Sequence, residues 1–189
     1  MPRERQTLVS DSSTLTIRSQ RSDDLEHLFA LINADEVLLD SLELPYLSEE
    51  VFRERYGSPP ANTHTLIAET SLPSGRKRMI GVVWLKTMRP RRRHVGQLTL
   101  AIHPDYRGSE AEATLLGAAL DLVDNWLALR RVEAVVYVDD RATIDLYERH
   151  GFTCEATMRR YAFRAGVYSD ACLMARLRTP VVSSDANAE

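Results

Sequence analysis

Residues 95–138 contain a strand, a tight turn, a long helix and a second strand in direct succession, and this order limits the possible folds of the chain. The run over 95–102 predicts a strand that leads through the turn into a helix, which we expect over 110–129. Residues 132–138 form a near-continuous apolar run, which is typical of a strand buried on both faces. Such a β-α-β unit places its two strands parallel and side by side in one sheet.

The helix expected over 110–129 has apolar residues at every third or fourth position, the pattern of one buried face. These positions are Leu115, Leu116, Ala119, Leu120, Val123, Trp126 and Leu127. Ser109 precedes the helix and Glu112 follows three residues later, which makes a Ser-x-x-Glu capping box. We expect Ser109 to bond forward to a backbone amide and Glu112 to reach back to one.

The rest of the chain adds strands and helices on both sides of this unit. Strands are predicted over 14–19, 64–69 and 78–88, and helices over 22–32, 48–57 and 141–151. A closing hairpin is expected over 152–177, with its turn at Gly166. The predicted fold class is α/β (α+β): a mixed, mostly antiparallel sheet with helices on both faces.

A single domain is expected over residues 14–178 of this 189-residue chain. The polar residues 1–13 are expected to form a flexible arm, and residues 179–189 a disordered tail. The chain is 44% apolar and has a net charge of −3, which argues against nucleic acid as a partner of the whole domain. No apolar run reaches the about 18 residues of a membrane span, and two cysteines fit a reducing, cytoplasmic setting.

Ligand sites in sheets of this kind lie at the carboxyl end of a strand that diverges from its neighbour. The stretch from His103 to Leu116 lies there, and a turn that enters a helix offers backbone N–H groups to an anion. Glu110 and Glu112 oppose this use, because they put carboxylates where glycine would allow close approach. One pair of like charges at about 5 Å, in an effective dielectric of about 20, repels by roughly 3 kcal/mol, or about two decades of affinity.

Three segments, residues 98–127, 135–152 and 159–177, together resemble the GNAT superfamily of N-acetyltransferases, and the similarity covers about 14–178. The first is similar to the strand, pyrophosphate loop and helix of the cofactor motif. The second is similar to the later strand and the helix that bears a catalytic tyrosine. The third resembles the final hairpin of bacterial members that act on free amino acids, and residues 42–55 fit the same subgroup.

The resemblance implies a site for acetyl-CoA, whose pyrophosphate the family grips with a loop of Arg or Gln, two residues, Gly, one residue, then Gly or Ala. The positions implied in binding are Leu100, Ile102, Arg107, Gly108, Ser109, Ala111 and Asp140. Backbone amides near Leu100 and Ile102 would hold the pantetheine arm and polarise the acetyl carbonyl. The chain departs from the family at Glu110 and Glu112, which replace the two small residues, and at Asp140, where the family usually has asparagine.

The resemblance also implies residues for catalysis and for the acceptor. Tyr147 lies where the family's tyrosine protonates the departing thiolate, a step that suits a phenol with a pKa of about 10. Pro45 and Tyr46 are implied in the acceptor pocket, and an aromatic residue there would suit an apolar or aromatic amino acid.

A general base is not singled out by the sequence. His94, at the start of a strand, is one candidate, and Glu69 and Asp139 are others with no stronger support. The basic loop over 89–94 is either a solvated hairpin tip or a contact for an acidic partner or for the cofactor's 3′-phosphate.

The leading hypothesis is an enzyme that moves an acetyl group from acetyl-CoA to the primary amine of a small molecule, an amino acid by resemblance. The reaction is direct attack with no acyl-enzyme, no metal is implied, and the superfamily suggests a homodimer. The alternative is a non-catalytic binding or regulatory protein that has lost acetyl-CoA through Glu110 and Glu112. A third hypothesis, a donor without a pyrophosphate, has only the altered loop in its favour.

Overall fold

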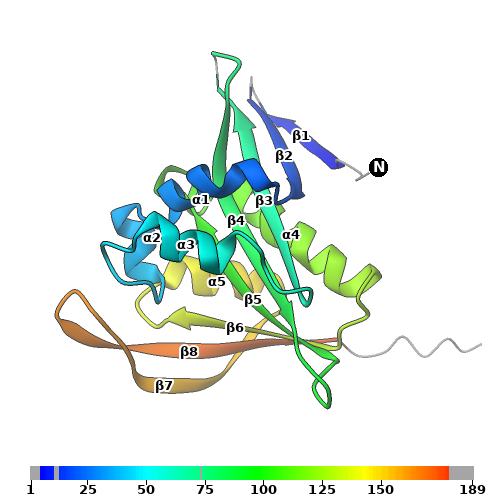
Figure 1. Cartoon of the computed structure of the whole chain (residues 1–189). Helices are drawn as coiled ribbons and strands as arrows, with labels where there is room; N and C mark the ends of the chain where they lie inside the picture. Colours follow the sequence, from blue (N-terminus) through cyan, green and yellow to red (C-terminus); the bar gives the residue numbers. More distant parts are fainter. Residues whose placement is uncertain (1–4, 11–12, 73, 179–189) are drawn as a thin grey trace, which may run out of the picture.

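The computed structural model describes residues 5–10, 13–72 and 74–178 (Figure 1). Its strands are β1 (Arg5–Ser10), β2 (Ser13–Ser19), β3 (Thr63–Ser71), β4 (Lys77–Thr87), β5 (Val95–Ile102), β6 (Arg131–Tyr137), β7 (Thr153–Arg164) and β8 (Val167–Leu177). Its α-helices are α1 (Leu25–Ile32), α2 (Asp35–Asp40), α3 (Glu49–Tyr56), α4 (Glu110–Asn125) and α5 (Arg141–Arg149). Short 3-10 turns at Ser22–Asp24 and Pro104–Tyr106 precede α1 and α4.

The described strands form one sheet in the order β1-β2-β3-β4-β5-β6-β8-β7. Neighbouring strands are antiparallel except β5 and β6, which are parallel. The mixed, mostly antiparallel sheet predicted from the sequence is therefore confirmed, as is the adjacency of the two strands that flank α4. The closing hairpin inserts β8 between β6 and β7 and turns at Gly166, whose φ of 84° suits glycine.

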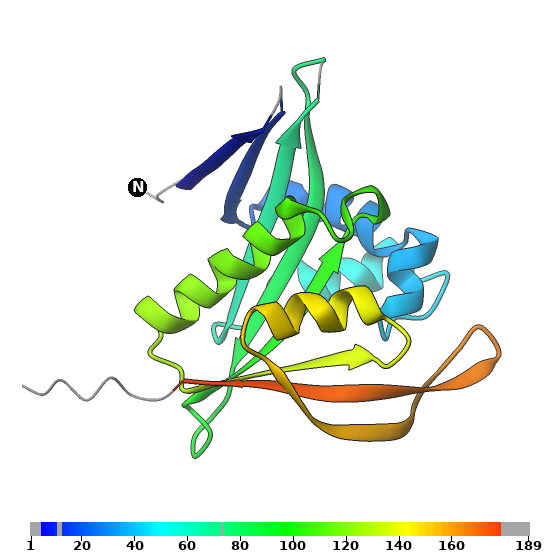
Figure 2. The same cartoon turned by 180° about the vertical axis from the view of Figure 1, so that it is seen from behind.

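Helices cover both faces of the sheet, as predicted. Figure 1 shows α1 and α3 on the near face, and Figure 2 shows α4 and α5 on the opposite face. The core on the near side includes Leu28, Leu31, Phe52, Ile67 and Val82. The core on the far side includes Leu115, Leu116, Ala119, Val123, Tyr147, Phe152 and Met174. Each helix thus buries its apolar stripe against the sheet, which is the main source of stability in such a layered domain.

The structure differs from the prediction at the N-terminus and at α2. Residues 5–10 form β1, which pairs with β2, where the sequence predicts a flexible arm. The segment is short and polar, so only the exposed edge of β2 makes it a strand. Helix α2 has six residues, too few for a periodic pattern to identify it. The predicted disordered tail at 179–189 lies outside the described residues, as do residues 1–4.

Helix α4 ends at Asn125, four residues before the predicted end at 129. Trp126 was expected on the buried face, but it is 63% exposed and caps the helix with a φ of −126°. Ala128 then takes a φ of 49°, and the chain turns back to bury Leu129 beside Gly96. The sequence could not show this, because the apolar period continues through Leu127 although the helix has ended.

No helix among the described residues is long and apolar enough to cross a membrane.

Candidate active site

Strands β5 and β6 pair over only three residues and then separate. Val95, Gly96 and Gln97 pair with Arg131, Val132 and Glu133, and no pairing continues beyond them. Residues 98–102 of β5 and 134–137 of β6 instead line a cavity of about 530 Å³. The cavity therefore begins where the two parallel strands diverge, the position predicted for a ligand site.

The cavity passes through the sheet rather than lying on one face. On the face covered by α3 it is lined by Tyr56 and Trp84, whose rings are 5.4 Å apart. On the face covered by α5 it is lined by Thr143 and Tyr147. Because α3 and α5 lie on opposite faces (Figures 1 and 2), a molecule on one side can meet a molecule on the other within the split.

Backbone amides of β5 face the split. The amide of His103 donates to the carbonyl oxygen of Ile80 on the β4 side, over 2.7 Å. In an antiparallel pair, alternate residues direct their backbone polar groups to opposite sides. The amides of Leu100 and Ile102 consequently point toward β6, where no strand pairs with them, and both residues line the cavity.

Tyr147 is held on α5 by packing against the core. Its side chain is 2% exposed, and its ring meets that of Phe152 edge to face at 4.9 Å. Burial raises the pKa of Tyr147, and the carboxylates of Glu112 and Asp140 raise it further. The phenol is therefore protonated at neutral pH and can donate a proton into the cavity that it lines.

The start of α4 is closed by the carboxylate of Glu112. The amide of Gly108, a residue with a φ of 72°, donates to Glu112 Oε2 over 2.6 Å. The predicted capping box is thus half formed, because Glu112 reaches back to the residue before the cap. Ser109 makes no forward bond and its hydroxyl donates to the carbonyl of Tyr106 over 2.6 Å, since the 3-10 turn brings that oxygen within reach.

Arg107 and Asp140 flank this start of α4 and also line the cavity. The Arg107 guanidinium donates to the carboxylate of Asp40 at the end of α2. Asp140 caps α5 by accepting from the amide of Thr143 over 3.1 Å. The structure therefore brings Leu100, Ile102, Arg107, Asp140 and Tyr147 to one cavity. Gly108, Ser109 and Ala111 lie beside it without lining it.

A model of the Acetyltransferase (GNAT) family matches residues 26–152 of this sequence. The chain belongs to the GNAT family. It is an acyltransferase, and the family is one that uses acetyl-CoA. The L-amino acid N-acetyltransferase AaaT of Escherichia coli is 28% identical over 167 residues, which cover 88% of this chain and 99% of that protein.

Solved GNAT structures share the fold across most of their length. The spermidine N-acetyltransferase of Vibrio cholerae, in complex with CoA and spermine, has a TM-score of 0.74 and 25% identity, over 86% of this chain and 95% of that one. A GNAT acetyltransferase from Streptococcus pneumoniae has a TM-score of 0.69 and 28% identity, over 87% and 99%.

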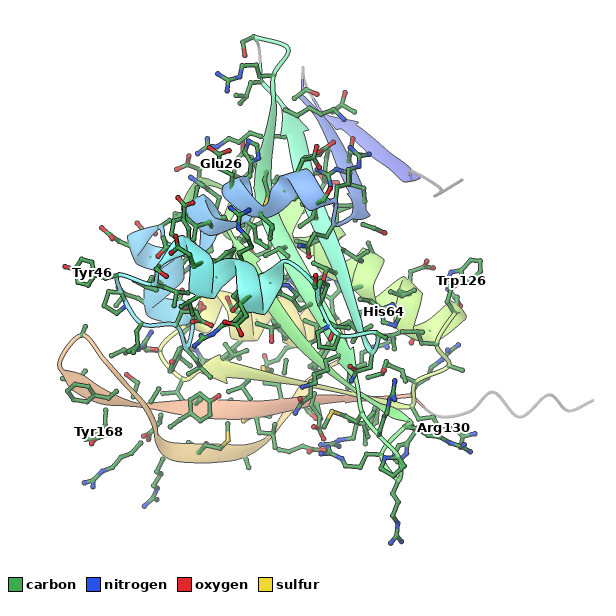
Figure 3. The ribbon with its side chains drawn as sticks, in the orientation of Figure 1. Glu26, Tyr46, His64, Trp126, Arg130 and Tyr168 are labelled. Carbon is green, nitrogen blue, oxygen red and sulfur yellow. The ribbon has the colours of Figure 1, made fainter. Side chains whose placement is uncertain are left out.

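The acceptor residues implied by the resemblance lie outside the cavity in this structure. Pro45 and Tyr46 are exposed and do not line the cavity; Tyr46, labelled in Figure 3, is 99% exposed. Tyr46 also has a φ of 65°, in the left-handed region. Residues 41–43 of the same loop line the cavity instead.

The residues that the sequence offered as general base do not line the cavity between β5 and β6. His94 is exposed at the other end of β5, Glu69 is held by Arg18 and Lys77, and Asp139 is paired with Arg164. None of the three lines the cavity.

Glu43 is a residue that the sequence reasoning missed. It lines the cavity and accepts from the Tyr56 hydroxyl over 2.8 Å and from Arg55 over 2.6 Å. The sequence offered one signal for Glu43: it lies three residues before Tyr46, within residues 42–55, which carry part of the family resemblance.

The donor site fits one end of acetyl-CoA and not the other. The diverging strands, the amides of Leu100 and Ile102 that point into the split and the phenol of Tyr147 suit a pantetheine arm and its thioester. The loop that should receive the diphosphate has its Gly108 amide already bonded to Glu112. No group of three or more metal-ligating side chains that could hold an ion occurs in residues 5–10, 13–72 and 74–178.

The burial of Glu112 predicts a pH-dependent stability. Burial raises the pKa of Glu112, and the amide of Gly108 and the charge of Arg107 only partly oppose this. The other charged groups that influence it are Asp140 and Arg149, and Tyr147 lies nearby. A carboxyl whose pKa is raised by folding contributes full stability below its unfolded value of 4.5 and loses it as the pH rises through the folded value.

Glu112→Gln should therefore melt at a temperature about 2–4 °C higher than the wild type at pH 7.5, the shift that about 1 kcal/mol produces in a domain of this size. The amide keeps the bond to Gly108 and removes the buried charge. Differential scanning calorimetry between pH 4 and 8 measures the difference, which should vanish below about pH 4.5. A difference that is constant across this range would contradict the assignment.

Proposed function

We propose that this chain transfers an acetyl group from acetyl-CoA to the primary amine of a small molecule, and that the acceptor is an amino acid. The observation that carries the proposal is the cavity that crosses the sheet where β5 and β6 diverge. The name of the relative AaaT, an L-amino acid N-acetyltransferase, supports this acceptor class.

The residues divide the reaction between the two faces of the sheet. The thioester enters from the α5 side, where the backbone amides near Leu100 and Ile102 bind its pantetheine arm and polarise its carbonyl. The amine enters from the α3 side and attacks the carbonyl carbon, so that a C–N bond forms while the C–S bond breaks. Tyr147 gives its proton to the thiolate, and Glu43 is placed to accept the proton that the amine loses.

The acceptor end of the cavity suits an amino acid with an apolar side chain. Tyr56 and Trp84 supply an aromatic wall. Lys86, two residues along β4 from Trp84 and so on the same side of the strand, supplies a positive charge for a carboxylate.

Trp84→Ala is expected to raise the KM for the acceptor about tenfold, equal to about 1.4 kcal/mol of lost contact, with the KM for acetyl-CoA unchanged. Steady-state kinetics with each substrate varied in turn measures both constants. Trp84→Phe is the matched control because it keeps a ring in the wall. An equal rise in both KM values would show damage to the fold rather than loss of an acceptor contact.

The direct test of the proposal is release of free thiol from acetyl-CoA with a panel of L-amino acids, with spermidine as the contrasting amine. Turnover with amino acids and not with spermidine is the expected result. No turnover with any amine, in a folded protein, would favour a non-catalytic role. We also propose that the protein is a homodimer, which light scattering would measure. A reducing, cytoplasmic location belongs to the same proposal, because Cys154 and Cys172 are free thiols.

A further inference from the structure

We infer that Glu112 is an internal substitute for the donor's diphosphate, so that the enzyme recognises an acyl-pantetheine thioester by its acyl group and pantetheine arm and gains little from the nucleotide. This inference rests on the proposed function and adds the class of donor. It makes Glu112 a residue that determines donor specificity.

The first observation is that the loop's anion position is occupied. Glu112 Oε2 accepts from the amide of Gly108 over 2.6 Å, and the side chain is 2% exposed. Its second oxygen, Oε1, is buried and has no hydrogen-bond partner within the described part of the chain. A carboxylate that lines the cavity and has one unpartnered oxygen holds the place and charge of a phosphate group.

The second observation concerns the cation that a diphosphate would pair with. Arg107 is bonded to Asp40, so its charge is already compensated by the end of α2. Its Nε is buried and has no hydrogen-bond partner among the described residues, and the hydrogen bond to Asp40 orients the guanidinium. With Glu112 and Asp140 also lining this part of the cavity, a diphosphate would meet two carboxylates and one neutralised arginine.

The third observation is that the thioester end of the site is open. β5 and β6 pair only over residues 95–97 and 131–133, and Leu100, Ile102 and Tyr147 line the cavity beyond that point. Recognition is therefore divided: the pantetheine end can bind, and the nucleotide end is repelled. Removing the nucleotide from the donor should cost the wild type little.

The test compares acetyl-CoA with S-acetylpantetheine, which carries the same thioester on the same arm without the diphosphate. In the wild type, kcat/KM for the two donors should differ by less than about tenfold. Glu112→Ala frees the Gly108 amide and removes the charge, so its preference for acetyl-CoA should rise on the order of 100-fold. Glu112→Gln keeps the bond and removes the charge, so its preference should rise by a smaller factor.

Glu110→Gln is the matched control, because Glu110 is exposed in the same first turn and loses the same charge. Its donor preference should stay within about twofold of the wild type. An equal rise in the preference for acetyl-CoA in Glu110→Gln and Glu112→Gln would overturn the inference, since the loss of one negative charge anywhere in the first turn of α4 would then explain both results. A wild type that prefers acetyl-CoA by 100-fold or more would also overturn it.

Calorimetric binding of CoA and of pantetheine separates this inference from the proposed function, because it needs no turnover. If no amine is acetylated, the proposed function fails. The inference still holds if Glu112→Ala tightens CoA about 100-fold and leaves pantetheine unchanged. If CoA binds the wild type, Glu112→Ala and Glu112→Gln with one affinity, or binds none of them, the inference fails.

Discussion

Tyr147→Phe is expected to lower kcat for acetyl transfer by about 100-fold, the lower range for loss of a general acid, with both KM values within about twofold. The variant keeps the ring that packs on Phe152 and removes only the proton that the thiolate needs. The initial rate of thiol release at saturating donor and acceptor measures kcat. Because burial raises the pKa of Tyr147 above the ordinary value of 10.0, activity that depends on the protonated phenol should persist beyond pH 10.

Tyr168→Phe is the control for this result, because Tyr168 is exposed on β8 and labelled in Figure 3 far from α5. Its kcat should equal that of the wild type. A Tyr147→Phe enzyme with full kcat at every pH would remove the phenol from the reaction and leave the thiolate to be protonated by water.

Arg18→Ala is expected to cost about 3–5 kcal/mol of unfolding free energy at pH 7, because it leaves two buried carboxylates without their cation. Arg18 Nε donates to Glu69 over 2.9 Å, and both Nη atoms donate to Asp24 over 2.7 Å. The Arg18 side chain is 9% exposed and each carboxylate 6%. Urea unfolding followed by circular dichroism measures the loss.

The cost should fall as the pH is lowered. Burial acts to raise the pKa of Asp24 and Glu69, but hydrogen bonds from Arg18, and from Lys77 to Glu69, outweigh it and lower both values. Such groups stabilise the fold above their unfolded values of 3.8 and 4.5 and lose this contribution as the pH falls through the folded values. Arg18→Ala and the wild type should therefore converge in acid.

Arg92→Ala is the matched control. Arg92 also donates to a carboxylate, Glu133, over 2.6 Å, but its side chain is 49% exposed and Glu133 keeps a second cation, Arg131, so the loss should stay below about 1 kcal/mol. If Arg18→Ala cost no more than Arg92→Ala, the buried network would not contribute more to stability than a pair with a half-exposed arginine.

The sequence by itself determined the features that depend on neighbours along the chain. The apolar run of residues 132–138 and the helix before it predicted the parallel pair, and the helix expected over 48–57 forms as α3, with Ser48 as its N-cap. The same patterns carried the family resemblance, which the match over residues 26–152 confirms. Tyr147 lies on the cavity as its motif implies, although its chemical role is still a prediction.

Only the tertiary structure decided which loop residues reach the site and what state the anion loop is in. Arg107 and Asp40 are 67 residues apart in sequence, and nothing local to either predicts their bond. Glu112 has the sequence signature of an exposed capping residue, yet α4 packs it against the cavity at 2% exposure. A helical period or a cap is set by contacts a few residues away, whereas burial and pairing of charge depend on segments that only the folded sheet brings together.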